Sequence, residues 1–581
     1  SFAMDNVALG NFRKMNEDGD HLSSVGSLHL TSSRQLNLFN PKPHQMVEVE
    51  LSGELLESEP PFSLFGKKGK TLFQLCKEIQ HYTNDPKVDG LILFFDNPKL
   101  GLSQAQQLRR YLEGFRDSGK KLIAYSEDYS QRDYYLASLC DEIYLMPVGS
   151  LDLKGLAAVL GYLKGTMDKL GVQVQVARVR DYKTAANSFA YEGATEAEAE
   201  MFNWLLDDIY EQMCSQIAAG RNLGIDEFKE MVDAGPYYGQ RALKVGLVDS
   251  LIYYDKIKIR LEDDDFVVIA ESDYWKLPEY KEEWPDIRTP KVAIIYAERA
   301  IVSGESGSNP FSGRYMGSKT IADAIRKARE DKSIDAIILR VDSPGGSAVA
   351  SEAIYREVQR TVTSEENRKP FIVSMGNVAG SGGYYIACGA DTIVAEEGTI
   401  TGSIGVLGLK FNLAGLHKKI YYNTSTFKRG EHSDAWSLSR PLTEAELDMM
   451  QEAVESIYDD FTSHVSADRG IQKDELNTIA EGRVWTGKQA QERGLVDLLG
   501  GLDVAPEVTK ARLGLTEYEP VKLEFYPEPP GFLVGVLTDI AQLGVKPLPK
   551  IVSEALEPVV LIAECYDGEP LMLMPYEIEI K

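Results

Sequence analysis

The stretch from Phe371 to Tyr385, FIVSMGNVAGSGGYY, carries the residue types that covalent catalysis needs. The apolar residues 371–373 predict a buried strand. Small residues follow it, and Ser381 then stands among glycines, directly before an apolar segment of helical length. A serine at a strand-to-helix turn exposes its hydroxyl where the helix N-terminus favours developing negative charge. We interpret Ser381 as a candidate nucleophile; the alternative is a glycine-rich packing turn.

A second glycine turn, VDSPGG, occupies residues 341–346 between a buried strand and a predicted helix. Its proline fixes the turn, and its glycines leave backbone N–H groups free to point inward. Such N–H groups are what an oxyanion hole requires. We predict that Gly345 and Gly346 supply donors from this turn, and that the N–H of Gly382 supplies another directly after the serine.

A serine hydroxyl also needs a base within hydrogen-bond reach. His417 and His432 are the histidines that a Ser-His-Asp arrangement would use, but neither has a local carboxylate partner in the sequence. A lysine kept neutral by burial is the alternative. Lys183, in RDYKTAANSF, and Lys428, in TFKRGEHSDAW, are the candidates. The neighbouring Arg429 indicates that Lys428 belongs to a solvated basic turn.

The overall composition excludes several other kinds of site. The net charge of −27 argues against nucleic acid as a partner, and it argues against an acidic membrane surface held by charge. Five scattered cysteines without a CxxC pair, and seven histidines without an HExxH pattern, indicate neither a disulfide framework nor a metal site. We predict no cofactor.

The elements around these residues recur in a second series, which indicates a tandem duplication. GLILFFDNP at Gly90 is repeated as AIILRVDSP at Ala336, which is 246 residues later, and GLVD at Gly246 is repeated at Gly494, which is 248 residues later. YYLASLCDEIY and the segment beginning TEAEAE recur at similar offsets. Strand and helix patterns alternate within each copy, which is typical of parallel βα units.

The two copies differ at the candidate site. At an offset of 250 residues, Ser381 corresponds to Gln131. At the offset of 246 residues, VDSPGG corresponds to FDNPKL in the first copy. The serine and the glycine turn therefore survive together in one copy. This pattern favours a catalytic role for the two turns over a purely structural one, because a turn that serves only packing can be kept in either copy independently.

The duplication predicts the domain organisation. Residues 1–44 form a polar lead-in that is extended or poorly ordered, 45–255 and 290–510 are the two copies, and 256–289 are a linker with some packed aromatic residues. Residues 511–581 lie outside the repeat, with a strand-like end at 576–580. No apolar run is long enough to span a membrane. The opening Ser-Phe-Ala-Met resembles a cloning remnant, so a natural N-terminal anchor is compatible with this sequence.

These motifs resemble signal peptide peptidase A, also called protease IV, of the Clp/crotonase superfamily. VDSPGG, SMGNVAGSGGYYIA, TITGSIGV and RVWTGKQAQERGLVD occur in order with the spacing of that family, and the double length resembles its long form. The resemblance covers about residues 45–510. It implies an α/β fold that is a tandem duplication of a Clp/crotonase-like (ββα superhelix) domain.

The resemblance also implies roles for individual residues. Ser381 is the nucleophile, Lys183 from the first copy is the general base, Ser403 in TGSIG orients the lysine, and Gly345 with the N–H of Gly382 forms the oxyanion hole. The sequence departs from the family at two places. Gly380 stands where alanine is usual, and Arg180 stands where a glycine commonly precedes the lysine by three positions.

The implied activity is that of a serine endopeptidase on cleaved signal peptides and other unfolded or membrane-associated peptides. The resemblance further implies a bowl-shaped homotetramer associated with a membrane, either the bacterial inner membrane facing the periplasm or the chloroplast thylakoid. A crotonase-type acyl-CoA enzyme is the alternative, because that fold also uses paired backbone N–H donors as an oxyanion hole. A catalytically inactive scaffold is a third hypothesis, against which the intact Ser381, Lys183 and Gly345 argue.

Overall fold

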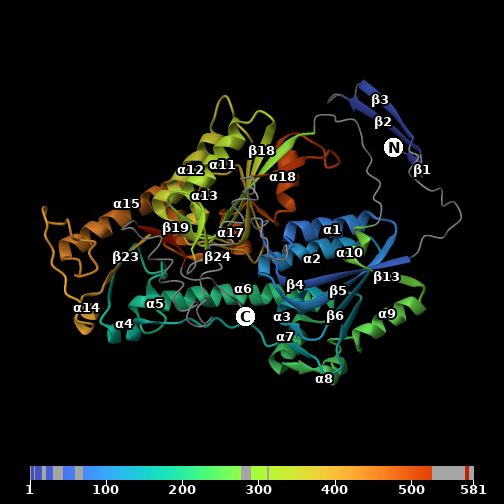
Figure 1. Cartoon of the computed structure of the whole chain (residues 1–581), viewed down its shortest axis with the longest axis horizontal. Coiled ribbons are helices and arrows are strands. Elements are labelled where there is room, and N and C mark those ends of the chain that lie inside the picture. The colour runs from blue at the N-terminus through green and yellow to red at the C-terminus, as the bar shows by residue number, and fades with distance from the viewer. Residues whose placement is uncertain are drawn as a thin grey trace.

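The computed structural model describes residues 2–4, 7–15, 21–30, 44–58, 70–276, 289–309, 313–526 and 570–574, with the backbone alone for the strands up to residue 30 and for 308, 309 and 313. Within these ranges the chain forms two predominantly parallel sheets covered by helices, which lie side by side (Figure 1). A separate antiparallel sheet of β1 (Phe2–Met4), β2 (Val7–Met15) and β3 (His21–Leu30) lies in the predicted lead-in.

The first sheet has the strand order β12-β8-β6-β5-β4-β13, and its neighbouring strands are parallel. Its central strands β6 and β8 are buried for most of their length, as expected for a parallel sheet with helices on both faces, whereas the edge strands β12 and β13 are half-buried or exposed. They are β4 (His44–Glu54), β5 (Val88–Lys99), β6 (Lys121–Ser126), β8 (Glu142–Leu145), β12 (Ser250–Leu251) and β13 (Phe266–Ala270).

Helices of the first copy follow the predicted pattern. The first helix is α1, and Thr71 caps it in a capping box with Gln74. The helices are α1 (Leu72–Asn84), α2 (Leu102–Asp117), α3 (Gln131–Ala137), α6 (Glu196–Gly220), α7 (Ile225–Ala234), α8 (Gly239–Lys244), α9 (Tyr254–Asp263) and α10 (Glu271–Tyr274). A small sheet of β7 (Tyr129–Ser130), β9 (Ser150–Asp152) and β11 (Tyr237–Tyr238) lies beside them.

The second sheet repeats the first, with the order β24-β22-β20-β18-β14-β26, with β21 beside β20 and with β25 beside β21. Its strands are β14 (Lys291–Glu298), β18 (Ile334–Ser343), β20 (Phe371–Gly380), β21 (Thr392–Ala395), β22 (Ile400–Gly402), β24 (Val484–Thr486), β25 (Leu498–Leu499) and β26 (Lys522–Tyr526). The series β4-β5-β6-β8 therefore recurs as β14-β18-β20-β21. The predicted duplicated α/β fold is confirmed.

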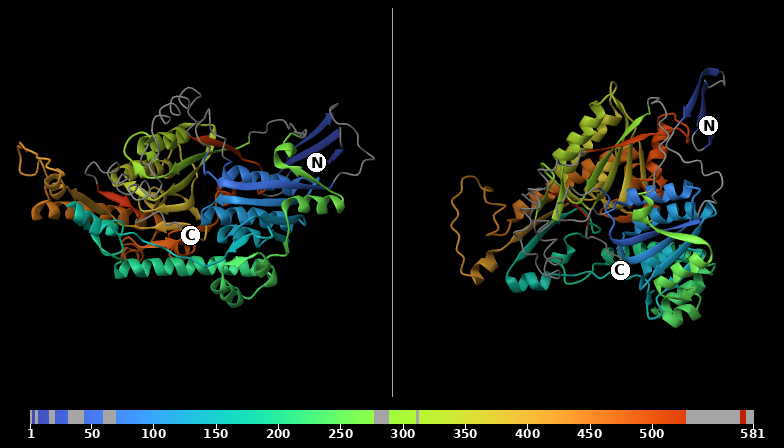
Figure 2. Two further views of the ribbon diagram at one scale, coloured as in Figure 1. Left: turned by 60° about the horizontal axis from the view of Figure 1, so that its bottom comes forward. Right: turned by 45° about the vertical axis from the view of Figure 1, so that its right-hand side comes forward.

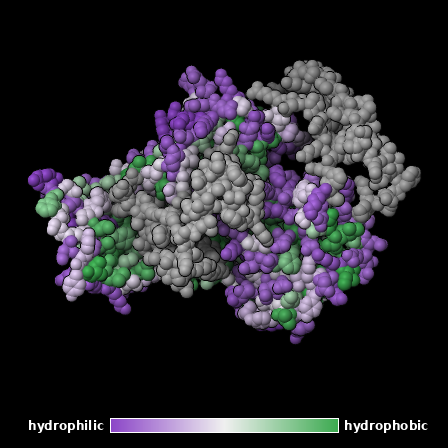
Figure 3. Space-filling view, in the orientation of Figure 1, coloured by the Kyte–Doolittle hydropathy of each residue, from purple (hydrophilic) through white to green (hydrophobic). Residues whose placement is uncertain are grey.

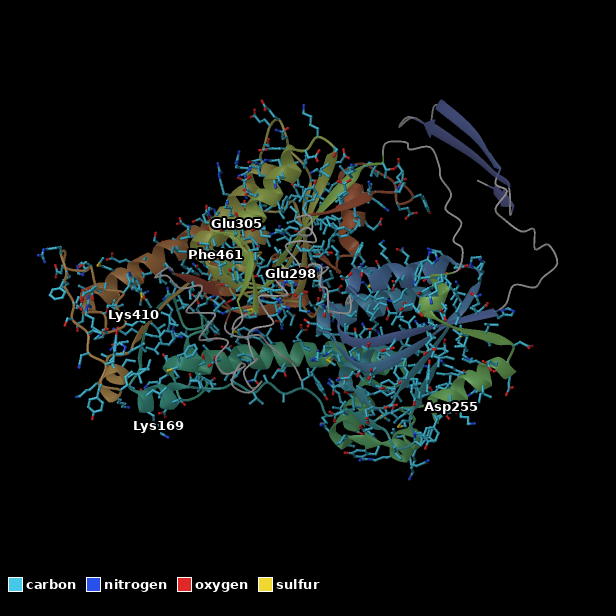
Figure 4. The ribbon with its side chains drawn as sticks, in the orientation of Figure 1. Lys169, Asp255, Glu298, Glu305, Lys410 and Phe461 are labelled. Carbon is cyan, nitrogen blue, oxygen red and sulfur yellow. The ribbon has the colours of Figure 1, made fainter. Side chains whose placement is uncertain are left out.

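Helices cover this second sheet as they cover the first. They are α11 (Ser318–Glu330), α12 (Ala348–Val362), α13 (Gly382–Ala387), α15 (Glu444–Arg469), α16 (Lys473–Ile479), α17 (Gly487–Glu492) and α18 (Val504–Arg512). Phe461 of α15, labelled in Figure 4, packs on Tyr385 of α13 with ring centroids 4.6 Å apart. The helix that follows Ser381 is thereby held from its outer side.

Segments outside the predicted copies complete both sheets. In residues 256–289, expected to be a linker, β13 pairs with β4, and Trp275 packs on Tyr82 of α1. In residues 511–581, β26 pairs with β14 in the equivalent place. Both additions cover a sheet edge that would otherwise expose unpaired backbone groups. Two further aromatic residues of the predicted linker, Tyr280 and Trp284, and the strand-like end at 576–580 lie outside the described residues.

A third, mixed sheet joins the two copies, with the order β10-β23-β27-β19-β15-β17-β16. The first copy supplies β10, which pairs antiparallel with β23 over six residues. The strands are β10 (Gln173–Arg178), β15 (Ile301–Val302), β16 (Gly307–Asn309), β17 (Gly313–Gly317), β19 (Gly345–Ser347), β23 (Leu407–Asn412) and β27 (Leu571–Leu573). The helices α4 (Lys164–Leu170), α5 (Asn187–Ala190) and α14 (Ala414–Lys419) cluster at the same end of the molecule (Figures 1 and 2).

Side-chain contacts lock the two copies together. Trp204 of α6 stacks on Trp485 of β24 with ring centroids 4.8 Å apart, and its indole N–H donates to the carbonyl of Val484 at 2.9 Å. Arg110 of α2 pairs with Glu396 and Asp503 of the second copy. Because these contacts are buried or half-buried, they fix the position of the first copy relative to the nucleophile turn.

One end of the molecule exposes large apolar side chains. They follow α14 in the sequence and are Ile420, Tyr421, Tyr422 and Phe427. Figure 3 shows hydrophobic surface at the end of the molecule where α14 lies. Among the described residues, no helix combines the length and the apolar character that crossing a membrane requires.

Candidate active site

Ser381 lies at the sharp turn between β20 and α13 and is fully buried in this structure. Its φ of 55° and ψ of −114° are a strained combination for a residue with a side chain, and such strain concentrates at functional sites. The N–H of Ser381 donates to the carbonyl of Gly402 at 2.8 Å. Added Cβ atoms at Gly382 and Gly383 would lie 2.6 Å from Ser351 Oγ and 2.7 Å from the Ser343 carbonyl oxygen. The turn therefore requires glycine after the serine.

Lys183 reaches Ser381 from the other copy. It follows β10, and its side chain is completely buried. Its Nζ lies 2.6 Å from Ser381 Oγ, 3.0 Å from Ser403 Oγ and 3.0 Å from the Ser403 carbonyl oxygen. The structure thus brings together the three side chains that the resemblance implied, across 198 and 220 residues of sequence.

Burial lowers the pKa of Lys183 well below its usual value. The cause is the loss of solvation of the ammonium form, which this site does not offset with a carboxylate. A neutral amine within 2.6 Å of a hydroxyl can accept its proton, whereas an ammonium cannot.

Glycines make room for the lysine. Gly482 has φ +92°, and a Cβ there would lie 2.5 Å from the backbone nitrogen of Lys183. A Cβ at Gly405 would lie 3.2 Å from Lys183 Cδ. Arg180, which stands where the resembling family has glycine, adopts a left-handed φ of 62°. That conformation costs a residue with a side chain about 1–2 kcal/mol, which explains why glycine suits the position.

We expect Gly482→Ala to displace the lysine. The change should cost about 1–2 kcal/mol of stability from the left-handed φ alone, and it should also lower peptidase activity because the new Cβ meets the Lys183 backbone. Gly470→Ala is the matched control, since Gly470 has φ +68° with nothing within 4 Å of an added Cβ. Equal activity of the two variants, measured as kcat/KM beside their thermal unfolding, would contradict this account.

Buried polar contacts that no sequence motif predicted hold the lysine segment. Asn187 accepts a hydrogen bond from Arg178 at 2.7 Å and donates to Glu198 at 3.2 Å. Glu198 also accepts from the Tyr162 hydroxyl at 2.9 Å and is completely buried. These residues anchor the segment after β10 to the start of α6. The one sequence signal near these contacts was the segment TEAEAE, whose Thr195 caps α6. It was recognised only as a part of the repeat.

The glycine turn lies against the nucleophile turn. Gly345 has φ +101°, and a Cβ there would lie 2.7 Å from the backbone nitrogen of Gly382. The first N–H groups of a helix have no partner within the helix, and the helix dipole favours negative charge there. The N–H of Gly345 donates to Ser343 Oγ at 3.2 Å, and Gly346 pairs in register with Met572 of β27. Gly345 and Gly382 are thus adjacent, and both Gly345 and Gly346 lie in the strand pair of β19 with β27.

The other candidate bases lie away from the serine. Lys428 is exposed and pairs with Asp434 at 2.9 Å, as predicted for a solvated basic turn. His432 contacts Glu446 at 3.2 Å on the surface, and His417 packs on Tyr422. Among the described residues, no group of three or more His, Cys, Asp and Glu side chains could hold a metal ion.

Comparisons with known proteins agree with this arrangement. Peptidase family S49 matches the chain twice, at residues 114–267 and 363–516. The chain is 32% identical over 480 residues to the chloroplastic serine protease SPPA of Arabidopsis thaliana, which covers 81% of this chain and 70% of that protein. It is 35% identical over 454 residues to protease 4 of Haemophilus influenzae, which covers 74% of this chain and 71% of that protein. Protease 4 of Salmonella typhi is 32% identical over 505 residues, which cover 85% of this chain and 79% of that protein.

A duplicated α/β fold with a buried serine at a strand-to-helix turn is the architecture of a hydrolase with a nucleophilic residue. The chain belongs to peptidase family S49. It is a serine peptidase of the tandem-repeat form, as its two family matches and its similarity to the SPPA and protease 4 proteins show.

Proposed function

We propose that the chain is an endopeptidase with a Ser-Lys dyad, in which Ser381 is the nucleophile and Lys183 is the general base. The observation that carries this proposal is the 2.6 Å contact between Lys183 Nζ and Ser381 Oγ in a fully buried site. Among the described residues, His417, His432 and Lys428 have other partners and do not contact the serine.

The partners of Lys183 define how the base works. A neutral amine has two N–H donors and one lone pair. The two donors match the Ser403 hydroxyl and carbonyl oxygens, each at 3.0 Å, which leaves the lone pair for the Ser381 hydroxyl. Ser403 is thus a positioning residue that directs the amine without adding charge.

The reaction would proceed by acyl transfer. Lys183 takes the hydroxyl proton as Ser381 Oγ attacks the peptide carbonyl, and the backbone N–H groups of Gly345 and Gly382 stabilise the oxyanion. Lys183 then returns the proton to the leaving amine. In the second half, water attacks the acyl-enzyme with the same lysine as base. For the N–H of Gly345 to serve, its hydrogen bond to Ser343 Oγ must be exchanged for the oxyanion.

The proposed substrates are cleaved signal peptides and other unfolded or membrane-associated peptides. The names of the relatives support this substrate class, among them a putative signal peptide peptidase of Enterococcus faecium that is 33% identical over 227 residues. A buried dyad admits an extended chain and excludes folded protein. We also propose a homotetramer and association with a membrane surface. The apolar loop after α14 supports a contact of this kind, since exposed apolar patches mark interaction sites.

A fluorophosphonate probe tests the proposed chemistry directly. It should label Ser381 in the wild-type chain, with the modified peptide identified by mass spectrometry. Peptide hydrolysis should be lost in proportion to labelling. A crotonase-type enzyme has no activated serine, and family membership does not favour that alternative. An unlabelled but folded protein would overturn the proposal.

The pH dependence should identify the base. Since burial lowers the pKa of Lys183, kcat/KM should increase from neutral to mildly alkaline pH as the lysine loses its proton. Ser403→Asp should move this increase to higher pH, because a carboxylate stabilises the ammonium. Ser403→Ala should shift it less.

Profiles of kcat/KM from about pH 6 to 10 for the three forms provide the measurement. This range brackets the pKa of about 7–8 that is typical of tuned catalytic lysines. A wild-type profile that is already flat above pH 6 would point to a histidine or carboxylate base. An unshifted profile in Ser403→Asp would remove Ser403 from the site.

A further inference from the structure

A row of stacked side chains crosses the seam between the two copies, next to the proposed base. The contacts run in the order Arg483, Tyr182, Trp204, Trp485 and Arg493. The guanidinium carbon of Arg483 lies 3.9 Å from the ring centroid of Tyr182, and that of Arg493 lies 3.8 Å from the ring centroid of Trp485. Between them, the ring centroids of Tyr182 and Trp204 are 5.9 Å apart, and those of Trp204 and Trp485 are 4.8 Å apart.

This row joins elements of both copies. Tyr182 directly precedes Lys183, and Trp204 lies on α6, so both rings belong to the first copy. Trp485 lies on β24 of the second copy, and Arg483 directly precedes that strand. The labels of α6 and β24 mark the place in Figure 1. The row therefore fixes the segment that carries the base against the copy that carries the nucleophile.

Arg483 contacts both sides of the lysine site. Its carbonyl oxygen accepts a hydrogen bond from the N–H of Ser403 at 2.7 Å. Ser403 has a left-handed φ of 51°, and its Oγ and carbonyl oxygen are the two acceptors for Lys183 Nζ. The side chain of the same arginine covers Tyr182, the residue before the lysine. One residue thus holds both the acceptors of the amine and the backbone from which the amine extends.

Ion pairs and a hydrogen bond fix the two stacked groups. Arg483 Nη1 pairs with Glu481 at 3.0 Å, and Glu481 lies 3.4 Å from Arg180 on the segment that leads to the lysine. The Tyr182 hydroxyl donates to Glu200 of α6 at 2.5 Å. A planar guanidinium stacks on a ring face, whereas the ammonium of a lysine is a strongly hydrated point charge on a flexible stem.

The charged groups around Lys183 interact with one another and with the backbone. Arg178 of β10 donates to the Lys183 carbonyl oxygen at 3.4 Å, and the N–H of Glu481 donates to the Tyr458 hydroxyl of α15 at 3.3 Å. Burial is the cause of the low pKa of Lys183. A neutral lysine in such a site depends on the exclusion of water, because water stabilises the ammonium form.

We propose that Arg483 is a positioning residue for the base, which holds Lys183 at the proton-transfer distance from Ser381 through its stack on Tyr182. This inference rests on the proposed function. The two members of the dyad come from different copies, so the relative position of the copies sets the distance between them. A displacement of about 1 Å can lower a rate about 100-fold, and the stack opposes such a displacement.

Replacement of Arg483 tests the proposal in the full-length chain. Arg483→Met removes the guanidinium and keeps an unbranched stem. It should lower kcat on a fluorogenic peptide about 10–100-fold with KM unchanged, because the contact positions a base and does not bind substrate. The increase of kcat/KM with pH should also move to higher pH, since water that reaches the amine raises the pKa of Lys183.

The other end of the row supplies the matched control. Arg493→Met removes the same kind of contact from Trp485, a ring that is not adjacent to the lysine in the sequence. Its kcat and its pH profile should remain near those of the wild type. Equal kcat and equal pH profiles in Arg483→Met and Arg493→Met would overturn the inference. A lower kcat with an unshifted pH profile in Arg483→Met would also overturn it, because loss of stability alone accounts for that result.

Tyr182 supplies a second pair of variants, which keeps the test decisive if Arg483→Met does not fold. Tyr182→Phe keeps the ring that Arg483 covers and loses only the hydroxyl bonded to Glu200, so kcat should remain near that of the wild type. Tyr182→Leu removes the ring and should reproduce the effects of Arg483→Met. The combined variant should be no worse than either single one, because the two residues act through one contact. Equal kcat in Tyr182→Phe and Tyr182→Leu would contradict the role of the stack.

A fluorophosphonate probe distinguishes failure of this inference from failure of the proposed function. If Ser381 and Lys183 do not form the dyad, the probe does not label the wild-type chain. If only the inference is wrong, the probe labels Ser381 in the wild type and in Arg483→Met at the same rate. The proposal requires labelling of the wild type and labelling about 10–100-fold slower in Arg483→Met.

Discussion

Ser381→Ala is expected to lower peptidase kcat/KM by about 10⁴–10⁶-fold, because removing the nucleophile of a catalytic unit leaves only the contributions of binding and the oxyanion donors. The variant should fold and assemble as the wild type does, since it removes one hydroxyl from a turn whose backbone is held by the Gly402 carbonyl. Steady-state kinetics on a fluorogenic peptide, with circular dichroism and sedimentation for fold and assembly, provide the measurement.

The duplication supplies a matched control for this variant. Gln131 occupies the equivalent position in the first copy, where its side chain accepts hydrogen bonds from the N–H groups of Lys154 and Gly155. Gln131→Ala should retain near wild-type turnover. Substantial peptidase activity remaining in purified Ser381→Ala, or an equal loss of activity in the two variants, would contradict the assignment of Ser381 as the nucleophile.

Lys183→Met is expected to be as damaging as Ser381→Ala, with a loss of about 10⁴-fold or more, because the dyad acts as one unit. Methionine keeps an unbranched apolar stem in the buried channel and removes the amine. The double variant should be no worse than either single one. Lys428→Ala, at an exposed ion pair with Asp434, is the control and should be nearly silent. Inactivation by Lys428→Ala instead would place the base in the second copy.

The same variant should change how stability depends on pH. Burial lowers the pKa of Lys183 in the folded chain, so between that lowered pKa and about 10.4 the unfolded chain binds one more proton. The free energy of unfolding of the wild type should therefore increase with pH across this window. Lys183→Met should lack this increase and should be relatively more stable near neutral pH. Parallel stability curves for the two chains would show that Lys183 is not neutral when folded.

The sequence by itself determined the duplication and most of the parallel strands. Repeats such as GLILFFDNP and AIILRVDSP show the same order of apolar and turn residues, and a buried parallel strand needs only a short continuous apolar run. The nucleophile turn was also readable, because a serine among glycines after such a run, lost as Gln131 in the other copy, is local information. Lys183 was one of several candidate bases until the resemblance to a family selected it.

Only the tertiary structure decided which groups meet. Lys183 reaches Ser381 because β10 of the first copy pairs with β23 of the second, a contact between segments more than two hundred residues apart that no local pattern encodes. The depressed pKa of the lysine likewise depends on complete burial, which is a property of the assembled fold. The edge strand β13 and the inserted β27 could not be predicted either. Short strands take their partners from whichever sheet edges the rest of the chain leaves open.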